Sequence, residues 1–266
     1  MPDLLDYLGF SGTMEVEDEA ENGLFEKHIP QADAVSKVKK GELFEGKLSI
    51  ARDNKEEGRL YLGKYGIEIK IFGLENLNRA LHGDRIAVEI LPEKEWKKIN
   101  FAELSEDIAT NEIEEEVHEG HYSESNSNSL KSLFEKIKKL DLTPTGKVVS
   151  VLKRVSRNFC GNLKPLEHIR EETGDSEIRE FIPADSRYPN FFIKIRNNGA
   201  LDNKKIIFKF DQWSINSKLP QGHFVSVIGD IGDAYTEGNV ILLEHNVEIK
   251  NFSKSVMECL PPEGVG

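Results

Sequence analysis

Two glycine-led strand patterns each occur twice in this chain, and they constrain its fold more than any other feature. Gly46 opens the run Gly-Lys-Leu-Ser-Ile, and Gly146 opens the similar run Gly-Lys-Val-Val-Ser-Val. Likewise, Gly83 precedes an alternating apolar run that resembles the run after Gly222. Glycine at such positions allows a strand to bend or bulge sharply, as at the corner of a small barrel. The repeats therefore predict two small, strongly bent barrels in series.

The expected fold class is mainly β, with two five-stranded barrels of the OB or cold-shock type in tandem. A chain of 266 residues exceeds the commonest single-domain size, which agrees with two domains. Barrels of this type commonly bind single-stranded nucleic acid. Apolar alternation predicts strands at residues 43–51, 58–62, 67–72 and 85–91 in the first barrel, and at 146–152, 159–163, 191–195, 205–210, 224–229 and 240–244 in the second.

Changes in composition divide the chain further. We expect an acidic lead segment at residues 1–35, a first barrel at 36–92, an acidic linker at 93–143, a second barrel at 144–250 and a tail at 251–266. The linker ends in a short amphipathic helix, because its apolar residues recur at helical spacing between Leu130 and Leu140, and Pro144 stops it. Residues 167–180 form a charged excursion between strands of the second barrel.

The charge of the chain is distributed unevenly. The net charge of −12 suggests at first that the chain repels nucleic acid. Residues 1–30 carry −7 and residues 101–125 carry −9, so the other 211 residues together carry +4. Acidic segments thus conceal a mildly basic folded part, and a nucleic-acid partner is not excluded.

Cysteine content and hydropathy indicate the compartment. Cys160 and Cys259 lie far apart and match no paired metal-ligand spacing, as in a reduced intracellular protein without a disulfide framework or zinc site. No stretch approaches the ~18 apolar residues of a membrane span, and the amino end lacks the pattern of a signal peptide. We therefore expect an intracellular protein that is not secreted and has no membrane partner.

The densest basic cluster predicts an RNA-binding site in the second barrel. Lys153, Arg154 and Arg157 occur in a run without acidic residues, and Phe159 follows them at the start of a strand. Cations neutralise phosphates and aromatic rings stack on bases, which is the chemistry of single-strand binding. The alternative is that Phe159 belongs to the core and the cations are ordinary solvated surface.

Loop rims of the first barrel supply further candidates. Arg52 follows the first strand, while Arg79 and His82 precede the last one, and we expect all three to contact RNA. Neighbouring Asn54 and Asp84 are expected to make local turn hydrogen bonds instead.

Two other aromatic positions favour packing over binding. The prolines on either side of Arg187 and Tyr188 indicate a rigid loop that packs against another domain. Trp213 is more typical of barrel-end packing than of a stacking platform.

The sequence shows no pattern of an active site. A two-metal nuclease needs several converging carboxylates, and the acidic runs here lie in segments without a strand or helix pattern. Phosphate-loop, nucleophile-elbow and dinucleotide motifs are also lacking. We expect no catalytic residues, no metal or other cofactor and no small-molecule substrate for this chain.

Several strings of residues resemble one family. Residues 77–89, Leu-Asn-Arg-Ala-Leu-His-Gly-Asp-Arg-Ile-Ala-Val-Glu, are similar to the first cold-shock domain of the catalytic exoribonuclease subunit of the eukaryotic RNA exosome. Residues 144–149, 183–189 and 242–247 resemble its second cold-shock domain. The resemblance runs in order over about residues 25–260.

The resemblance implies a function that composition does not. Members of this ribonuclease II class are processive, magnesium-dependent 3′-to-5′ exoribonucleases, and the residues that bind magnesium belong to a catalytic domain absent from this chain. The implied role is a non-catalytic module that binds single-stranded RNA and guides it to that domain, with exosome core subunits as further partners. Nuclear and cytoplasmic RNA processing and decay, including rRNA processing, are the implied setting.

Two alternatives remain open at this point. In the first, the barrels are a protein-interaction adaptor that docks the nuclease on the exosome core without touching RNA. In the second, the chain itself cleaves RNA, which predicts magnesium-dependent shortening of an oligomer.

Overall fold

The computed structural model describes residues 23–62, 66–98, 124–164, 172–173, 176–196 and 201–247. Most of the expected lead segment, the acidic stretch 99–123 and the expected tail lie outside the described residues. Contacts within the chain divide it into two compact units. Unit 1 comprises Met1–Arg157, Ser186–Phe192 and Asp211–Gln221, and unit 2 comprises Asn158–Asp185, Ile193–Phe210 and Gly222–Gly266.

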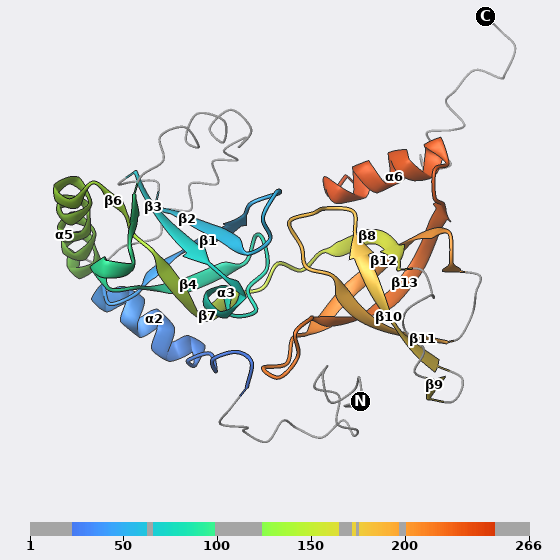
Figure 1. Cartoon of the computed structure of the whole chain (residues 1–266), viewed down its shortest axis with the longest axis horizontal. Helices are drawn as coiled ribbons and strands as arrows, with labels where there is room; N and C mark the ends of the chain where they lie inside the picture. Colours follow the sequence, from blue (N-terminus) through green and yellow to red (C-terminus); the bar gives the residue numbers. More distant parts are fainter. Residues whose placement is uncertain are drawn as a thin grey trace, which may run out of the picture. The chain divides into compact units, whose positions relative to one another are not determined.

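Unit 1 contains a closed five-stranded barrel (Figure 1). Its strands lie side by side in the order β3-β2-β1-β4-β7, and a bridge from Lys70 to Thr145 joins the two ends of the sheet. Closure leaves no open sheet edge, as in OB-type Greek-key barrels. The strands are β1 (Phe44–Ile50), β2 (Glu57–Leu62), β3 (Ile67–Phe72), β4 (Arg85–Ile90) and β7 (Gly146–Lys153).

The assignment of β7 corrects an expectation. Residues 146–152 were expected to open the second barrel, but β7 pairs antiparallel with β4, with Val151 opposite Ile86. Strands β1 and β7 therefore flank β4 on its two sides. A Cβ on Gly46 would lie 2.5 Å from the Leu60 side chain, and one on Gly146 would lie 2.5 Å from that of Val88. The repeated glycine pattern thus marks two tightly bent strands of one barrel and not the starts of two.

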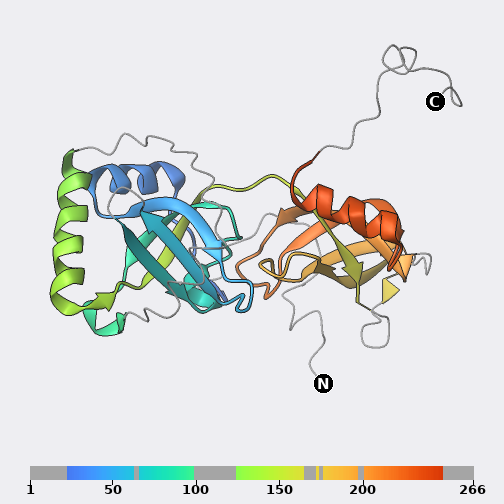
Figure 2. The ribbon, with the colours of Figure 1, turned by 90° about the horizontal axis from the view of Figure 1, so that it is seen from above.

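Short helices pack around the barrel of unit 1 (Figures 1 and 2). The amphipathic helix expected at the end of the linker is present as α5 (Glu124–Leu140). A second helix, α2 (Gln31–Lys40), was not anticipated, because only Ala34 and Val38 form its buried side. The smaller elements are α3 (Leu74–Leu77), the 3₁₀ turn η2 (Glu93–Glu95), and the strand pair β5 (Lys97–Lys98) and β6 (Leu142–Thr143).

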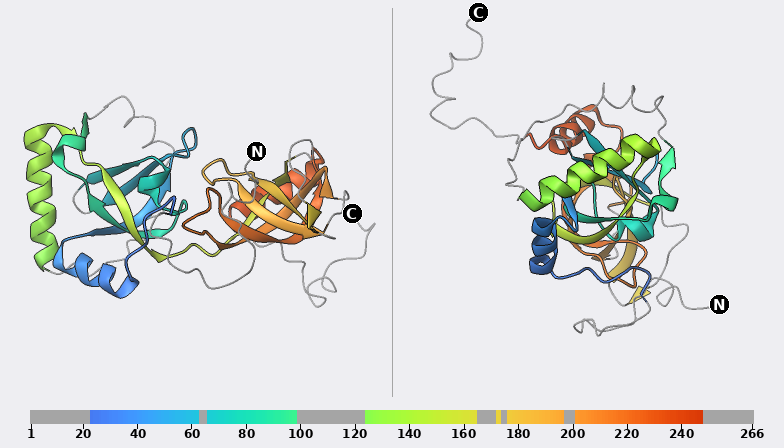
Figure 3. Two further views of the ribbon diagram at one scale, coloured as in Figure 1. Left: turned by 60° about the horizontal axis from the view of Figure 1, so that its bottom comes forward. Right: turned by 90° about the vertical axis from the view of Figure 1, so that its left-hand side faces the viewer.

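Unit 2 holds most of a second closed barrel (Figure 3). The strand order is β11-β13-β12-β8-β10-β9, and an additional pairing of β11 with β10 closes the ring. Phe181 and Phe208 stack in its interior with ring centroids 4.7 Å apart. Its elements are β8 (Asn158–Leu163), β9 (Glu172–Thr173), β10 (Ser176–Pro183), β11 (Phe191–Arg196), β12 (Lys204–Gln212), β13 (Gln221–Asp230) and α6 (Ala234–Glu244).

Two expectations for the second barrel were wrong. Residues 240–244 form the end of α6 and not a strand, since a short apolar run fits either element by period alone. The Asp233 side chain caps this helix by accepting a hydrogen bond from the Thr236 N–H at 2.9 Å. The charged excursion also contains a strand, because β10 begins at Ser176 and pairs with β8.

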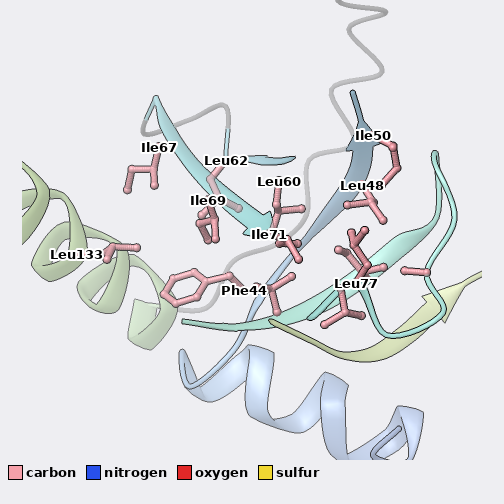
Figure 4. Close-up of a cluster of buried hydrophobic side chains, with 14 of the residues drawn as sticks. Phe44, Leu48, Ile50, Leu60, Leu62, Ile67, Ile69, Ile71, Leu77 and Leu133 are labelled. Carbon is pink, nitrogen blue, oxygen red and sulfur yellow. The ribbon is translucent and has the colours of Figure 1, made fainter. Parts of the chain in front are cut away.

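The core of unit 1 lies inside its barrel (Figure 4). Alternate residues of β1, β2 and β3 point inward, including the fully buried Leu48, Leu60 and Ile69. Leu133 of α5 packs against the open side of this cluster. Burial of each such side chain contributes about 1.5–3 kcal/mol, so these residues supply much of the stability of the barrel that carries the loops.

Candidate nucleic-acid interface

A buried carboxylate organises the loop that leads into β4. Asp84 is fully buried after Gly83, whose φ of 87° falls in the left-handed region. Its Oδ2 accepts from the Leu81 N–H at 2.8 Å and from Arg154 Nη1 at 2.5 Å, and its Oδ1 accepts from the Val155 N–H at 3.0 Å. Burial raises the pKa of Asp84, and these donors oppose that rise. The expected local turn bond is present, but Arg154, 70 residues later, is its main ionic partner.

Arg79 and Arg154, two of the arginines predicted to bind RNA, form hydrogen bonds between separate chain segments of unit 1. Arg154 Nη1 also donates to the Arg79 carbonyl oxygen at 3.0 Å. The Arg79 guanidinium in turn donates to the carbonyl oxygens of Glu26 at 3.0 Å and Trp213 at 3.3 Å. Both guanidinium groups therefore bind the backbone of their own unit, and we call this group the Asp84 network.

His28 lies beside this network. Its Nε2 donates to the Asn78 carbonyl oxygen at 2.8 Å. Burial is the main reason that the pKa of His28 falls to about 4, and the charges of Arg79 and Arg154 lower it further. The ring is therefore neutral at physiological pH.

Tyr188 brings two other predicted residues together. Its hydroxyl donates to the His82 carbonyl oxygen at 3.2 Å and accepts from Arg157 Nη1 at 3.1 Å. The Arg157 guanidinium carbon lies 5.2 Å from the centre of the Tyr188 ring. The His82 Nδ1 accepts from the Ile50 N–H at 3.1 Å, so the neutral ring carries its proton on Nε2. As expected of a packing residue, Tyr188 is buried, and its loop belongs to unit 1.

The remaining predicted residues are Arg52, Lys153 and Phe159, and they differ in exposure. Arg52 is exposed in the β1–β2 loop, and Lys153 is exposed at the end of β7. Phe159 is 2% exposed, in the core of unit 2, with its ring centroid 6.3 Å from that of Phe208. A base has no access to a ring in that position, so the alternative of a core residue holds for Phe159.

A small hollow lies beside the β1–β2 loop, and all of its lining residues belong to unit 1. Its volume is about 30 Å³. We call it the loop-end hollow; its lining includes Ile50, Lys55, Arg79, His82, Arg187 and Trp213. The sequence pattern did not predict Lys55 and indicated packing roles for Arg187 and Trp213, because the proximity of these residues depends on three separate chain segments.

The outer face of β2 and β3 has a different character. Arg59 forms ion pairs with Glu57 at 3.4 Å and Glu68 at 3.7 Å. Lys70 forms another with Glu57 at 3.7 Å. Tyr61 is 62% exposed on the same pair of strands. This face of an OB barrel is a usual binding surface for oligonucleotides, yet here its cations are paired with carboxylates.

The structure carries no indication of a metal centre or a membrane helix within the described residues. In that part of the chain, no three His, Cys, Asp or Glu side chains gather where they would ligate a metal ion. None of the described helices has the length and apolar character to span a bilayer.

Comparison with known proteins identifies both barrels as cold-shock domains. A model of the Rrp44-like cold shock domain matches residues 24–154, and a model of the Dis3-like cold-shock domain 2 matches residues 179–246. The first match ends one residue after β7, in agreement with the strand pairing. The chain belongs to the Rrp44/Dis3 family and contains the tandem cold-shock region of that family.

Relatives agree with this assignment. The exosome complex exonuclease RRP44 of Mus musculus is 34% identical over 98% of this chain, and the exosome complex exonuclease dis3 of Schizosaccharomyces pombe is 32% identical over 94%. This chain covers 26% and 25% of those proteins, so it spans about a quarter of their length. The solved structure of yeast Ssd1, a pseudonuclease, superposes with a TM-score of 0.58 at 24% identity, covering 85% of this chain and 28% of that one. That likeness concerns the fold alone.

Proposed function

We propose that this chain is a single-stranded RNA-binding module of an exosome-associated 3′-to-5′ exoribonuclease, and that it guides RNA towards a catalytic domain of the longer protein. Membership of the Rrp44/Dis3 family supports this role, since the relatives are named exosome exonucleases. The observation that carries the proposal is the loop-end hollow. It brings Lys55 and Arg187 together beside the β1–β2 loop, and this loop binds oligonucleotides in many OB folds.

Binding in this proposal is mainly electrostatic. Arg52, Lys55 and Lys153 are exposed cations of unit 1 that contact phosphates. Phosphate contacts carry little base information, so sequence preference is weak and affinity falls as salt rises. Weak preference suits a module that passes RNA along in steps.

A protein adaptor is the second candidate. It is favoured by the Asp84 network and the Tyr188 contacts, which engage Arg79, Arg154 and Arg157 in internal contacts. In this version the barrels dock the nuclease on exosome core subunits, and RNA passes elsewhere. Nuclear and cytoplasmic RNA decay, including rRNA processing, is the proposed setting of either role.

Fluorescence anisotropy distinguishes these candidates. A 3′-labelled single-stranded RNA of about 20 nucleotides is titrated with the chain at low and moderate salt, with magnesium present. The RNA-binding role predicts affinity that decreases with salt and RNA that stays intact on a gel. Absence of binding at low salt contradicts it and favours the adaptor, whereas magnesium-dependent shortening of the RNA places catalysis in this chain.

A further inference from the structure

The loop-end hollow has an aromatic wall in addition to its cations. Trp213 lines it together with Lys55 and Arg187. We propose that these three residues bind one nucleotide of single-stranded RNA, with the base stacked on the Trp213 indole and the adjacent phosphates beside Lys55 and Arg187. This inference rests on the proposed RNA-binding function and adds the residues and the mode of contact.

Trp213 is held in a fixed position. Its carbonyl oxygen accepts from Arg79 Nη1 at 3.3 Å, and its own Nε1 donates to the Ser217 carbonyl oxygen at 2.9 Å. Its ring packs edge-to-face with Phe25, with centroids 5.7 Å apart. Because the indole N–H is already engaged, the half-buried ring offers a ligand its π surface. A ring ordered in advance loses little entropy when a base stacks on it.

Arg187 is positioned by its two neighbours in sequence. The Ser186 hydroxyl donates to the Arg52 carbonyl oxygen at 3.0 Å, which joins this segment to the β1–β2 loop. On the other side, Tyr188 is anchored through its hydroxyl bond to His82. The backbone at Arg187 is therefore fixed next to the loop that carries Lys55.

The small volume of the hollow determines how a nucleotide binds there. A volume of about 30 Å³ is too small to enclose a base. The base therefore lies against the half-buried Trp213 indole, where stacking accepts every base, while the cations take the backbone charge. This combination of aromatic ring and cation is the usual one for single strands without a fixed sequence.

The outer face of β2 and β3 is the competing site in unit 1. There, Arg59 and Lys70 already lie within ion-pair distance of carboxylates. A phosphate would have to compete with Glu57 and Glu68 for these two cations, and the exposed Tyr61 is the ring whose substitution tests this face. Substitution of the two aromatic residues, Trp213 and Tyr61, therefore separates the two surfaces.

Fluorescence of Trp213 provides a direct readout of stacking. The chain has two tryptophans, so Trp96→Phe leaves Trp213 as the sole indole. Titration of this variant with single-stranded RNA is expected to quench the indole emission, with the same midpoint as the anisotropy of labelled RNA. Trp213→Leu is expected to weaken RNA binding about tenfold, the loss of one base stack, and Trp213→Phe to retain most of the affinity.

Matched variants serve as controls. Tyr61→Ala removes the exposed ring of the other face, and Lys131→Gln with Lys139→Gln removes two exposed charges on α5, at the other end of the first barrel from α3 (Figure 1). We expect both controls to leave the affinity for RNA within about twofold of that of the unchanged chain. Lys55→Gln with Arg187→Gln should instead reduce the slope of log affinity against log salt by the amount expected for about two phosphate contacts. Circular dichroism verifies that each variant is folded. If Trp213→Leu does not fold, the double variant Lys55→Gln with Arg187→Gln tests the inference instead.

The outcomes separate the inference from the function on which it rests. RNA binding without quenching, together with full affinity of the Trp213 and Lys55/Arg187 variants, overturns the inference and leaves the proposed function intact. A loss of affinity in Tyr61→Ala alone moves the contact to the β2–β3 face. No binding by the unchanged chain at low salt overturns the proposed function itself.

Discussion

Unit 1 contains two groups of basic residues that cannot be told apart from the sequence alone. Arg79 and Arg154 of the Asp84 network donate to a buried carboxylate and to backbone carbonyl oxygens. Arg52, Lys55 and Lys153 are exposed. The first group stabilises the arrangement of chain segments, although Arg79 also lines the loop-end hollow, and the second group is exposed to solvent. A cluster of basic residues in a sequence therefore does not by itself identify a binding surface, because burial and internal partners decide which cations are accessible.

The largest expected effect is the loss of the ion pair at the centre of the Asp84 network. Arg154→Met leaves the Asp84 carboxylate buried without its cation. We expect the free energy of unfolding to decrease by about 3–5 kcal/mol, as when one partner of a buried pair is removed. Urea unfolding measures it, with Lys153→Met as the control at the adjacent, exposed position, where the change stays within about 0.5 kcal/mol. If Arg154→Met and Lys153→Met lowered the free energy of unfolding equally, the two groups of cations would not differ in their structural role.

A pH-dependent effect is expected from His28. Its folded pKa of about 4 lies below the ordinary 6.5, so the unfolded chain binds the proton first as pH falls. The stability that neutral His28 provides is therefore complete above pH 6.5 and declines towards pH 4, by up to about 3 kcal/mol.

His28→Gln tests this dependence, because glutamine retains a donor for the Asn78 carbonyl and does not titrate. Urea unfolding between pH 6.5 and pH 4 should give a flatter pH profile for the variant than for the unchanged chain. Parallel profiles would show that His28 is not the group responsible.

A smaller effect is expected at Arg79. Arg79→Met removes the donors to the carbonyl oxygens of Glu26 and Trp213, and we expect a loss of about 2 kcal/mol in unfolding free energy, typical of charged hydrogen bonds. Hydrogen exchange should also increase at the Phe25 amide, which pairs with the Ile215 carbonyl in the same region. Arg52→Met is the control, and a comparable loss there would contradict the assignment of Arg79 to a structural role.

Much of the fold follows from local sequence pattern, and most of the site does not. Period-two alternation identified β1 to β4, and helical spacing identified α5, because each signal lies within a few neighbouring residues. The sequence did not show that β7 belongs to the first barrel, because β1 and β7, the two strands that flank β4, have similar sequences.

The partners within the site are still harder to read from the sequence. Arg79 contacts a carbonyl 134 residues away, and Arg154 contacts Asp84 across 70 residues. Local charge therefore predicted where cations lie along the chain, and only the folded structure shows which of them are already engaged.

The smallest effect on stability is expected at an exposed cation, where the effect on RNA binding sharpens the comparison. Lys153→Gln removes one charge at the end of β7 without touching the core, so its unfolding free energy should stay within about 0.5 kcal/mol of that of the unchanged chain. If Lys153 contacts a phosphate, the plot of log affinity against log salt should become less steep by about 0.7, the value for one contact to a single strand.

Lys131→Gln on α5 changes the net charge equally and should leave that slope unaltered. Because affinity at one salt concentration also reflects the overall charge of the chain, the slope is the more specific measurement. Equal slopes for the Lys153 variant and the unchanged chain would show that this lysine, although exposed, lies outside the path of the RNA. Exposure would then be necessary for phosphate contact but not sufficient.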